Sequence, residues 1–504
     1  MKKSLLLASA LLCAASSFAQ DMTIAPDGED VKRNFDPAQY EKFGEFELRN
    51  RWMISRNTDG EDFLKYLPDN NMACSVVLDT TIYVARPNNG SLLKFGLASG
   101  RYLGELILSY AEDGSLVNPD RATGSSAIPH IYNLTKDNFG HIVFHGYRAT
   151  VGLSDDGTDS GLALYYISDL ETGACIKAGD LMVTLDEYAN NYLKGRIDFS
   201  SIVGDVTREK AHAIVMAGGG ANAGLQIYRW KCEQGSDVWN GDFADKDGAG
   251  NPDVIMLAPV ATDGNVTQWQ GATVCTMVQD EEFSGSLFYI DGMSNQPALY
   301  DTNGNFVEGG THTATTTTDE ETGEQVVTAT RNFPADWYVT EVAVNGVCEF
   351  TIEGTNFVCY ANTQHGKSPG GDVKIAKLGD NFEWTADAGA EMAWASVPSG
   401  GMGMVSDTGR RVYNISATVV EGLDGSEGVY LMLNRNYNGI ALYTIAKEGW
   451  QDPNGQVDGI EDIVADEVEG AAKYYNLQGV EIANPENGLY IVKRGNKVAK
   501  ELVK

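Results

Sequence analysis

The sequence predicts an all-β protein, a β-propeller followed by a small C-terminal β module. Short apolar runs alternate with Gly, Asn and Asp turn signals, and no long helical periodicity is present. A hairpin also recurs, in which a strand-like run, a polar turn with glycine and a second strand follow one another. Glycine suits such turns because tight hairpins need positive φ. The turn glycines are Gly90, Gly161, Gly224, Gly285, Gly371 and Gly439.

Additional strands flank these hairpins. Most copies have an apolar run before the hairpin: CSVVL, HIYNL, FSSIV, VCEFTI and NISATVV. Several have a fourth candidate strand after it: RYLGELIL, ACIKAGDLMV and DVIMLAPV. Four strands repeated about six times are typical of a β-propeller. Six blades are favoured and seven are the alternative. An array of β-sandwiches is the other architecture, which the nearly regular spacing of the hairpins disfavours.

Two further segments fit a propeller with insertions in its loops. ATTTTDEETGEQVVTAT, at 314–330, alternates Thr and Val around an acidic turn and predicts an extra hairpin. FELRNRWMIS, at 46–55, precedes the first repeat. We expect this segment to add a strand to the last blade and close the ring, which would remove exposed sheet edges.

The chain divides into five predicted segments. Residues 1–19 form a signal peptide, with two lysines before an apolar run and small residues before the cleavage site after Ala19. A lipoprotein signal needs a small residue directly before its cysteine, but Leu12 stands before Cys13. Removal of the signal peptide is therefore favoured over lipidation of Cys13. An N-terminal extension (20–45), the propeller (46–449), an acidic linker (450–470) and a C-terminal β module (471–504) follow. No later stretch is long and apolar enough to predict a transmembrane segment.

Charge restricts the partners. The chain has 70 acidic and 37 basic residues, a formal net charge of −33. We therefore expect no nucleic-acid partner, because binding to phosphates needs a basic surface. The acidity is suited to keeping an exported protein soluble, and it also attracts cations.

Six cysteines remain after removal of the signal peptide, and most lie in apolar strand-like runs typical of buried free thiols. Cys348 and Cys359 are the exception. If Glu353 and Gly354 form the turn between them, the two cysteines face each other and a disulfide is feasible. If Gly354 and Thr355 form it, they do not.

The sequence contains no recognisable catalytic motif. VPSGG at 397–401 has Val where a serine-hydrolase elbow needs Gly, and no H-E-x-x-H or phosphate-binding loop occurs. His141 and His145 share one strand face, but the rise per residue separates them by roughly 13 Å, too far for one ion. Hydrogen-bonded histidines beside the channel or in loops are the favoured interpretation. No catalytic, cofactor-binding or metal-binding residue is therefore predicted, and any cofactor stays unknown.

The loop at 244–253, ADKDGAGNPD, resembles a calcium loop only in part. Asp245, Asp247 and Asp253 are oxygen ligands at short spacing. With Gly248 at position six, however, Phe243 occupies position one and no Glu stands at position twelve. A polar surface loop is the favoured interpretation, and calcium dependence stays open.

Three tryptophans lie beside polar groups: Trp269, Trp337 and Trp394. Aromatic faces flanked by amides and carboxylates suit sugars, which stack through C–H groups and hydrogen bond through hydroxyls. Ordinary packing between blades explains the same residues and is favoured for each one singly.

The C-terminal tail is short and basic. It reads AAKYYNLQGVEIANPENGLYIVKRGNKVAKELVK, with three expected strands at YYNLQGVEI, GLYIVKR and KVAKELVK. The tail resembles the last part of the type IX secretion sorting domains of exported Bacteroidota proteins, although it is shorter than a complete domain. The propeller-like body is similar in pattern to exported Bacteroidota propellers of unassigned function. The resemblance implies a Gram-negative source, contact with the export machinery, and delivery to the outer surface or medium.

The sequence thus predicts a secreted or surface-attached propeller that binds a glycan or protein ligand. Two alternatives stay open: a propeller-fold hydrolase or lyase acting on carbohydrate, and a non-catalytic structural or adhesion component. Paired carboxylates in an axial pocket would favour the enzyme.

Overall fold

The computed structural model divides into two compact units, Met1–Asn454 and Gly455–Lys504. The structure describes residues 22–24, 30–32, 40–56, 66–67, 72, 74–86, 90–109, 130–147, 161–182, 200–207, 212–217, 226–232, 234, 253–256, 261–262, 265–266, 272–278, 283, 285–292, 295–305, 307, 312–318, 321, 323, 325–331, 346–361, 373–380, 382, 393–398, 402, 413–435, 437–454, 473–475, 481–482, 488–494 and 497–503. Every element named below is a strand. No helix in these ranges is long and apolar enough to cross a membrane.

Antiparallel sheets of consecutive strands build the first unit. The first sheet contains β5 (Ser75–Leu78), β6 (Thr81–Arg86), β7 (Ser91–Gly96) and β8 (Tyr102–Ile107). The second contains β9 (His130–Lys136), β10 (Ile142–Tyr147), β11 (Gly161–Asp169) and β12 (Ala174–Met182). The third contains β13 (Ser200–Gly204), β14 (His212–Ala217), β15 (Gln226–Cys232) and β16 (Asp253–Met256).

Three more sheets follow. A three-stranded sheet contains β19 (Ala272–Met277), β20 (Leu287–Gly292) and β21 (Asn295–Asp301). The next contains β24 (Val347–Ile352), β25 (Thr355–Ala361), β26 (Val373–Lys377) and β27 (Ala393–Val397). The last has five strands, in the order β28 (Tyr413–Glu421), β29 (Glu427–Arg435), β30 (Gly439–Lys447), β4 (Phe46–Ser55) and β3 (Tyr40–Phe43).

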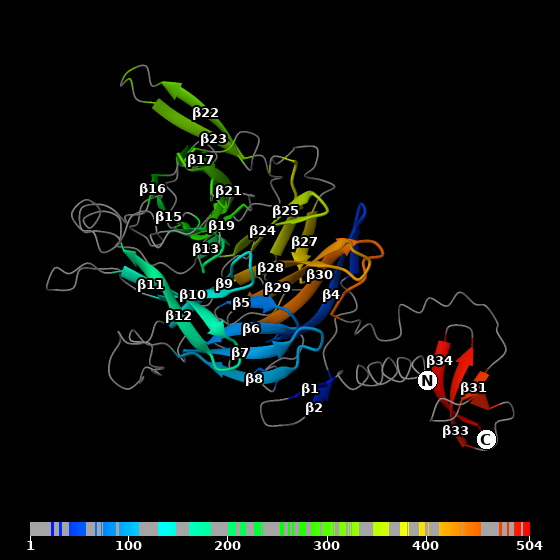
Figure 1. Ribbon diagram of the computed structural model, residues 1–504. Coiled ribbons are helices and arrows are strands. Elements are labelled where there is room, and N and C mark those ends of the chain that lie inside the picture. The colour runs from blue at the N-terminus through cyan, green and yellow to red at the C-terminus, as the bar shows by residue number, and fades with distance from the viewer. Residues whose placement is uncertain are drawn as a thin grey trace. The chain divides into compact units, whose positions relative to one another are not determined.

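The first strand of each sheet contacts the first strand of the next. The contacts run from β5 to β9, β13, β19, β24 and β28, and β28 returns to β5. Figure 1 shows these strands in the middle of the unit, with β8 and β16 farther out. The first unit is therefore a β-propeller, as predicted. Five of these sheets have four or five strands and form full blades, whereas β19–β21 form a sheet of only three strands. The number of full blades therefore differs slightly from the six that the sequence favours.

Apolar side chains fill the spaces between neighbouring sheets. One buried cluster joins the last sheet to β24–β27, and another joins it to β5–β8. Further clusters join β5–β8 to β9–β12, and β19–β21 to β24–β27. Nearly every residue of β29 and β30 is buried. Both faces of these strands are covered, which explains their continuous apolar sequences.

Most predicted strands occupy their predicted places. The runs CSVVL, HIYNL, FSSIV, VCEFTI and NISATVV contribute the inner strands β5, β9, β13, β24 and β28. The fourth copy of the hairpin is assigned wrongly. Gly285 lies between the first and second strands of its sheet, whereas Gly90 lies between the second and third strands of its own. Gly161 and Gly439 begin third strands, and Gly224 and Gly371 lie outside the described residues. The interval from Gly285 to Gly371 is consequently longer than the intervals between the other turn glycines.

The N-terminal strand closes the ring as expected. β4 pairs antiparallel with β30, from Ser55 opposite Gly439 to Phe46 opposite Lys447. Gly439 has φ of 135°, and a Cβ atom there would lie 2.1 Å from the carbonyl oxygen of Ile54. Only glycine lets the two backbones approach so closely.

The propeller unit continues past β30 to Asn454, into the predicted linker. Trp450 packs on the apolar cluster between the last sheet and the first. A Cβ atom at Gly428 would lie 2.4 Å from the Trp450 ring, so glycine makes room for it. Arg51 forms an ion pair with Asp452 at 3.1 Å. This segment therefore fastens the end of the propeller to its closing strands.

Three two-stranded sheets complete the first unit. They are β1 (Met22–Ile24) with β2 (Asp30–Lys32), β17 (Ala261–Thr262) with β18 (Asn265–Val266), and β22 (His312–Thr318) with β23 (Gln325–Arg331). β22 and β23 pair antiparallel from His312 opposite Arg331 to Thr318 opposite Gln325, which confirms the predicted insertion hairpin.

The second unit is a four-stranded sheet in the order β32 (Glu481–Ile482), β31 (Lys473–Tyr475), β33 (Gly488–Arg494) and β34 (Lys497–Val503). The predicted strand YYNLQGVEI is divided, because Tyr474 pairs antiparallel with Ile482 and the chain reverses between them. Asn476 and Gly479, both turn-forming residues, stand in the intervening sequence.

Candidate functional site

A cavity of about 150 Å³ lies between the inner strands of the propeller. All six inner strands contribute to its wall. The lining residues are Val76 of β5, 133–136 of β9, 200–202 of β13, Thr276 of β19, 347–349 of β24 and 414–418 of β28. Inner strands present one unpaired edge toward the axis, so polar groups gather there. The cavity is the candidate ligand site.

Neutral polar groups cover part of this wall and bond across neighbouring blades. The Asn133 amide donates to the Ser200 hydroxyl at 2.5 Å, and both residues are buried. The backbone N–H of Ser75 donates to the Asn414 side-chain oxygen at 2.8 Å. These groups are held in place by the protein itself.

Three side chains of β28 share one strand face because they alternate along it: Asn414, Ser416 and Thr418. Thr418 donates to the carbonyl oxygen of Val77 at 3.4 Å. The Ser416 hydroxyl oxygen is buried and has no hydrogen-bond partner among the described residues. A buried hydroxyl of this kind is a ready donor and acceptor for a bound molecule.

Lys136 brings a positive charge to the cavity. Its Nζ donates to the carbonyl oxygen of Val77 at 3.0 Å and to the Thr418 hydroxyl at 3.3 Å. Burial lowers the pKa of Lys136 from its ordinary 10.5 to about 8, and the attraction of Asp79 and Asp137 opposes this shift in part. The amine is therefore mostly protonated near neutral pH.

Glu349 brings a negative charge from β24. Its side chain is buried, and the Thr351 hydroxyl donates to one of its oxygens at 3.3 Å. Glu349 is the only carboxylate among the described residues that line the cavity. Two strands separate β24 from β9 in either direction around the ring, so Glu349 and Lys136 come from opposite walls. The paired carboxylates that would favour glycoside chemistry are not found in this described lining.

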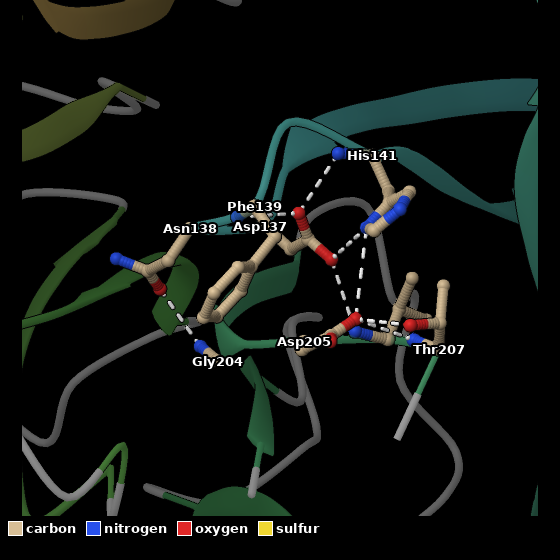
Figure 2. A network of polar contacts seen from close by, with 8 residues as sticks. Asp137, Asn138, Phe139, His141, Gly204, Asp205 and Thr207 are labelled. Atoms are coloured by element: carbon tan, nitrogen blue, oxygen red, sulfur yellow. Dashed lines mark hydrogen bonds and ion pairs between the residues drawn. The ribbon is translucent and has the colours of Figure 1, made fainter. Parts of the chain in front are cut away.

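A second polar cluster, Asp137, His141 and Asp205, joins the turn after β9 to the turn after β13 (Figure 2). We call it the inter-blade clasp. Asp137 Oδ1 accepts the backbone N–H groups of Phe139 at 2.9 Å and of His141 at 2.8 Å. Asp137 Oδ2 accepts the N–H of Val206 at 2.9 Å and lies 2.8 Å from His141 Nδ1. The clasp holds the second and third blades together.

The clasp has the composition of a metal site but different bonding. Its three ligand atoms lie within 4.8 Å of one another. Both oxygens of Asp137 already accept backbone N–H groups. Asp205 Oδ1 accepts the backbone N–H of Thr207 at 2.9 Å and its hydroxyl at 2.6 Å. Since donors of the protein already bond to both oxygens of Asp137 and to Oδ1 of Asp205, the geometry favours a structural role.

None of the histidines, aspartates and tryptophans named from the sequence is among the described residues that line the cavity. His141 belongs to the clasp, and His145 lies in β10 opposite Asn133 and Leu164. Asp245, Asp247, Gly248, Trp269 and Trp337 lie outside the described residues, while Asp253 begins β16 and Trp394 lies in β27. No sequence pattern singled out Lys136, Glu349 or Ser416. The available signal was polar residues inside apolar inner strands, as in HIYNLTK and NISATVV.

Cys348 and Cys359 lie opposite each other in β24 and β25. Glu353 and Gly354 both have positive φ, 50° and 73°, so the first of the two alternative turns is correct. The two cysteines are buried free thiols, and burial raises the pKa of Cys359 well above its usual range. Cys348 also lines the cavity.

No protein-family model matches this chain, and no curated protein matches it. It is similar to a DUF4623 family protein from Bacteroides eggerthii, with 10% identity, 85% of this chain and 87% of that chain covered, and a TM-score of 0.46. It is also similar to the PQQ-bound aldose sugar dehydrogenase of Streptomyces coelicolor, with 9% identity, coverage of 80% and 100%, and a TM-score of 0.38. The apo soluble aldose sugar dehydrogenase of Escherichia coli matches at 12% identity, with coverage of 75% and 96% and a TM-score of 0.34. Identities and TM-scores this low support no argument about function, and no residue role is carried over.

Proposed function

We propose that this protein is an exported β-propeller that binds a glycan, taking one polar end of it into the cavity between the inner strands. The observation that carries the proposal is the buried hydroxyl of Ser416, which lines the cavity and has no hydrogen-bond partner among the described residues. An unsatisfied buried polar group is unfavourable, and a ligand hydroxyl would satisfy it. A concave site with a few convergent polar groups is the default candidate for binding a small ligand.

The remaining wall supports the same ligand class. The amide of Asn133 and the hydroxyls of Ser200 and Thr418 offer neutral donors and acceptors, which match sugar hydroxyls. These groups are fixed by bonds to neighbouring blades, so little ordering is needed on binding. Residues of six different strands must keep their places to form this wall, so the intact ring is needed for binding.

Binding to a glycan panel tests the proposal. The matched variants are Ser416→Ala, which removes the hydroxyl, and Ser416→Leu, which fills the cavity. Thr172→Ala, on the exposed turn between β11 and β12 and outside the described cavity lining, is the control. We expect Ser416→Ala to weaken binding of the selected glycan about tenfold, the value of one hydrogen bond, and Ser416→Leu to abolish it. Unchanged affinity in both variants, each folded as judged by thermal unfolding, would place the ligand elsewhere and overturn the proposal.

The export part of the proposal rests on the N-terminal sequence and on the tail at 471–504. Expression of the full chain in a Bacteroidota host and of a chain ending at residue 470 would test it. We expect the first to reach the outer surface or medium with Gln20 as its N-terminal residue, and the second to stay in the periplasm. If both chains were divided equally between the periplasm and the outer surface or medium, the tail would have no sorting role.

A further inference from the structure

The Lys136 ammonium lines the cavity and forms no ion pair with a carboxylate among the described residues. It is partly buried, and its described hydrogen-bond partners are two neutral oxygens, the carbonyl of Val77 and the hydroxyl of Thr418. An ammonium has three N–H donors, so these partners leave one donor over. No described carboxylate forms an ion pair with it: Asp79 and Asp137 act on it only through longer-range attraction, and Asp137 is bonded within the clasp.

Burying a charge without a counterion is unfavourable, and an anion in the cavity would offset that cost. Carboxylates form charge-assisted hydrogen bonds with an ammonium that are roughly twice as strong as neutral ones. The cavity therefore presents a site for one negative group beside Lys136.

The opposite wall has the opposite preference. Glu349 accepts hydrogen bonds and repels a second carboxylate, so it favours a hydroxyl of the ligand. The Ser416 hydroxyl also lines the cavity, and it can hydrogen bond to a carboxylate or to a hydroxyl of the ligand. A ligand that spans the cavity thus has an acid group at one end and hydroxyls at the other.

We propose that the cavity recognises a hydroxy-carboxylate, with the acid group on Lys136 and a hydroxyl on Glu349. The inference rests on the proposed binding function and names its ligand class. A volume of about 150 Å³ resembles that of a cavity which holds benzene. A three-carbon hydroxy acid fits inside such a space, whereas a uronic acid enters with its acid end only.

Titration calorimetry of the full chain at neutral pH tests the inference with four probes: D-glycerate, D-glucuronate, glycerol and D-glucose. We expect each acid to bind at least tenfold more tightly than its neutral counterpart. Binding of glycerate alone identifies a small-molecule ligand, and binding of both acids identifies the acid end of a saccharide. Acetate, which has no hydroxyl, is expected to bind more weakly than glycerate.

Variants at Lys136 separate recognition of the acid from a purely structural role. Lys136→Met is expected to abolish the preference for acids while leaving the affinity for neutral probes within about twofold. Lys136→Arg retains the charge and is expected to restore the preference. Lys136→Gln replaces the methionine variant if that variant does not fold. Lys94→Met, on β7 and outside the cavity lining, is the matched control.

Each outcome bears on one proposal. Equal affinity of wild type for acids and neutral probes overturns the hydroxy-carboxylate inference and leaves glycan binding intact. An acid preference that survives in Lys136→Met also overturns it, since the charge then plays no part. If no probe binds but the glycan panel gives a ligand that depends on Ser416, the inference fails while the proposed function stands. Failure of both assays removes both.

Discussion

Two groups of buried polar residues start from neighbouring positions in the chain and differ in how fully they are bonded. In the inter-blade clasp, both oxygens of Asp137 accept backbone N–H groups and one also meets His141. In the cavity, Lys136 meets two neutral acceptors, and the Ser416 hydroxyl has none among the described residues. A hydrogen-bond network whose donors and acceptors are all paired stabilises the fold. A network with unpaired donors or acceptors can still form hydrogen bonds to a ligand. The comparison therefore supports a structural role for the clasp and the ligand binding that we propose for the cavity.

The largest expected effect comes from the clasp. Asp137→Ala leaves the N–H groups of Phe139, His141 and Val206 without their acceptor, and the hydrogen bond from Val206 is fully buried. Because each unsatisfied group is unfavourable by about 1–3 kcal/mol, we expect the free energy of unfolding to fall by about 4 kcal/mol in denaturant titration.

Asp169 provides the matched control for this change. It accepts the N–H of Glu171 at 2.8 Å in a similar turn, but it is exposed, so water replaces the lost bond. Asp169→Ala should lower stability much less. Equal effects of the two substitutions would show that the clasp contributes no more than an ordinary surface turn.

The next effect is a pH dependence of stability caused by Lys136. Its folded pKa, about 8, lies below the unfolded value near 10.5, so the unfolded chain binds more protons between these values. Stability therefore rises with pH in this window, and the penalty is fully present below pH 8. The total change is at most about 3 kcal/mol, from 1.36 kcal/mol for each pKa unit.

Lys136→Met isolates this contribution, because the variant has no amine to titrate. The difference in unfolding free energy between wild type and Lys136→Met, measured from pH 7 to pH 10.5, should change in favour of wild type as pH rises. A constant difference across the window would mean that the amine is as well solvated as in the unfolded chain.

The smallest expected effect concerns the Ser416 hydroxyl. Removing a buried group that has no described partner should leave stability unchanged or raise it by up to about 1 kcal/mol, so Ser416→Ala is expected to unfold no earlier than wild type. Thr418→Val is the comparison, because it loses the bonds to Val77 and Lys136 and should be destabilised by about 1 kcal/mol. Clear destabilisation by Ser416→Ala would mean that this hydroxyl is satisfied in the folded protein.

Local patterns made the propeller predictable. Alternating apolar runs bounded by glycine turns identified the inner strands and the strand that closes the ring, because hairpin pairing depends on residues near in the chain. The position of the turn sets which residues pair in a hairpin, so the sequence left only two alternatives for the pairing of Cys348 and Cys359. The blade around Gly285 was misassigned, since its hairpin has the same local appearance whether it joins the first and second strands or the second and third.

The candidate site was beyond such patterns. Lys136, Glu349 and Ser416 lie on three inner strands that are far apart in the chain, and nothing in their neighbours marks them as members of one cavity. The Asp137–His141–Asp205 group was equally hidden, because Asp205 comes from the next blade.

By itself, the sequence determined the strand content, the closing strand, the insertion hairpin, and an acidity that argues against nucleic acid, all of which depend on composition and short-range pairing. The tertiary structure alone decided which polar groups meet on the propeller axis and which of them are already bonded. The physical reason is that hydrogen-bond satisfaction in a buried site depends on every strand that surrounds it, and those strands are brought together only when the ring closes.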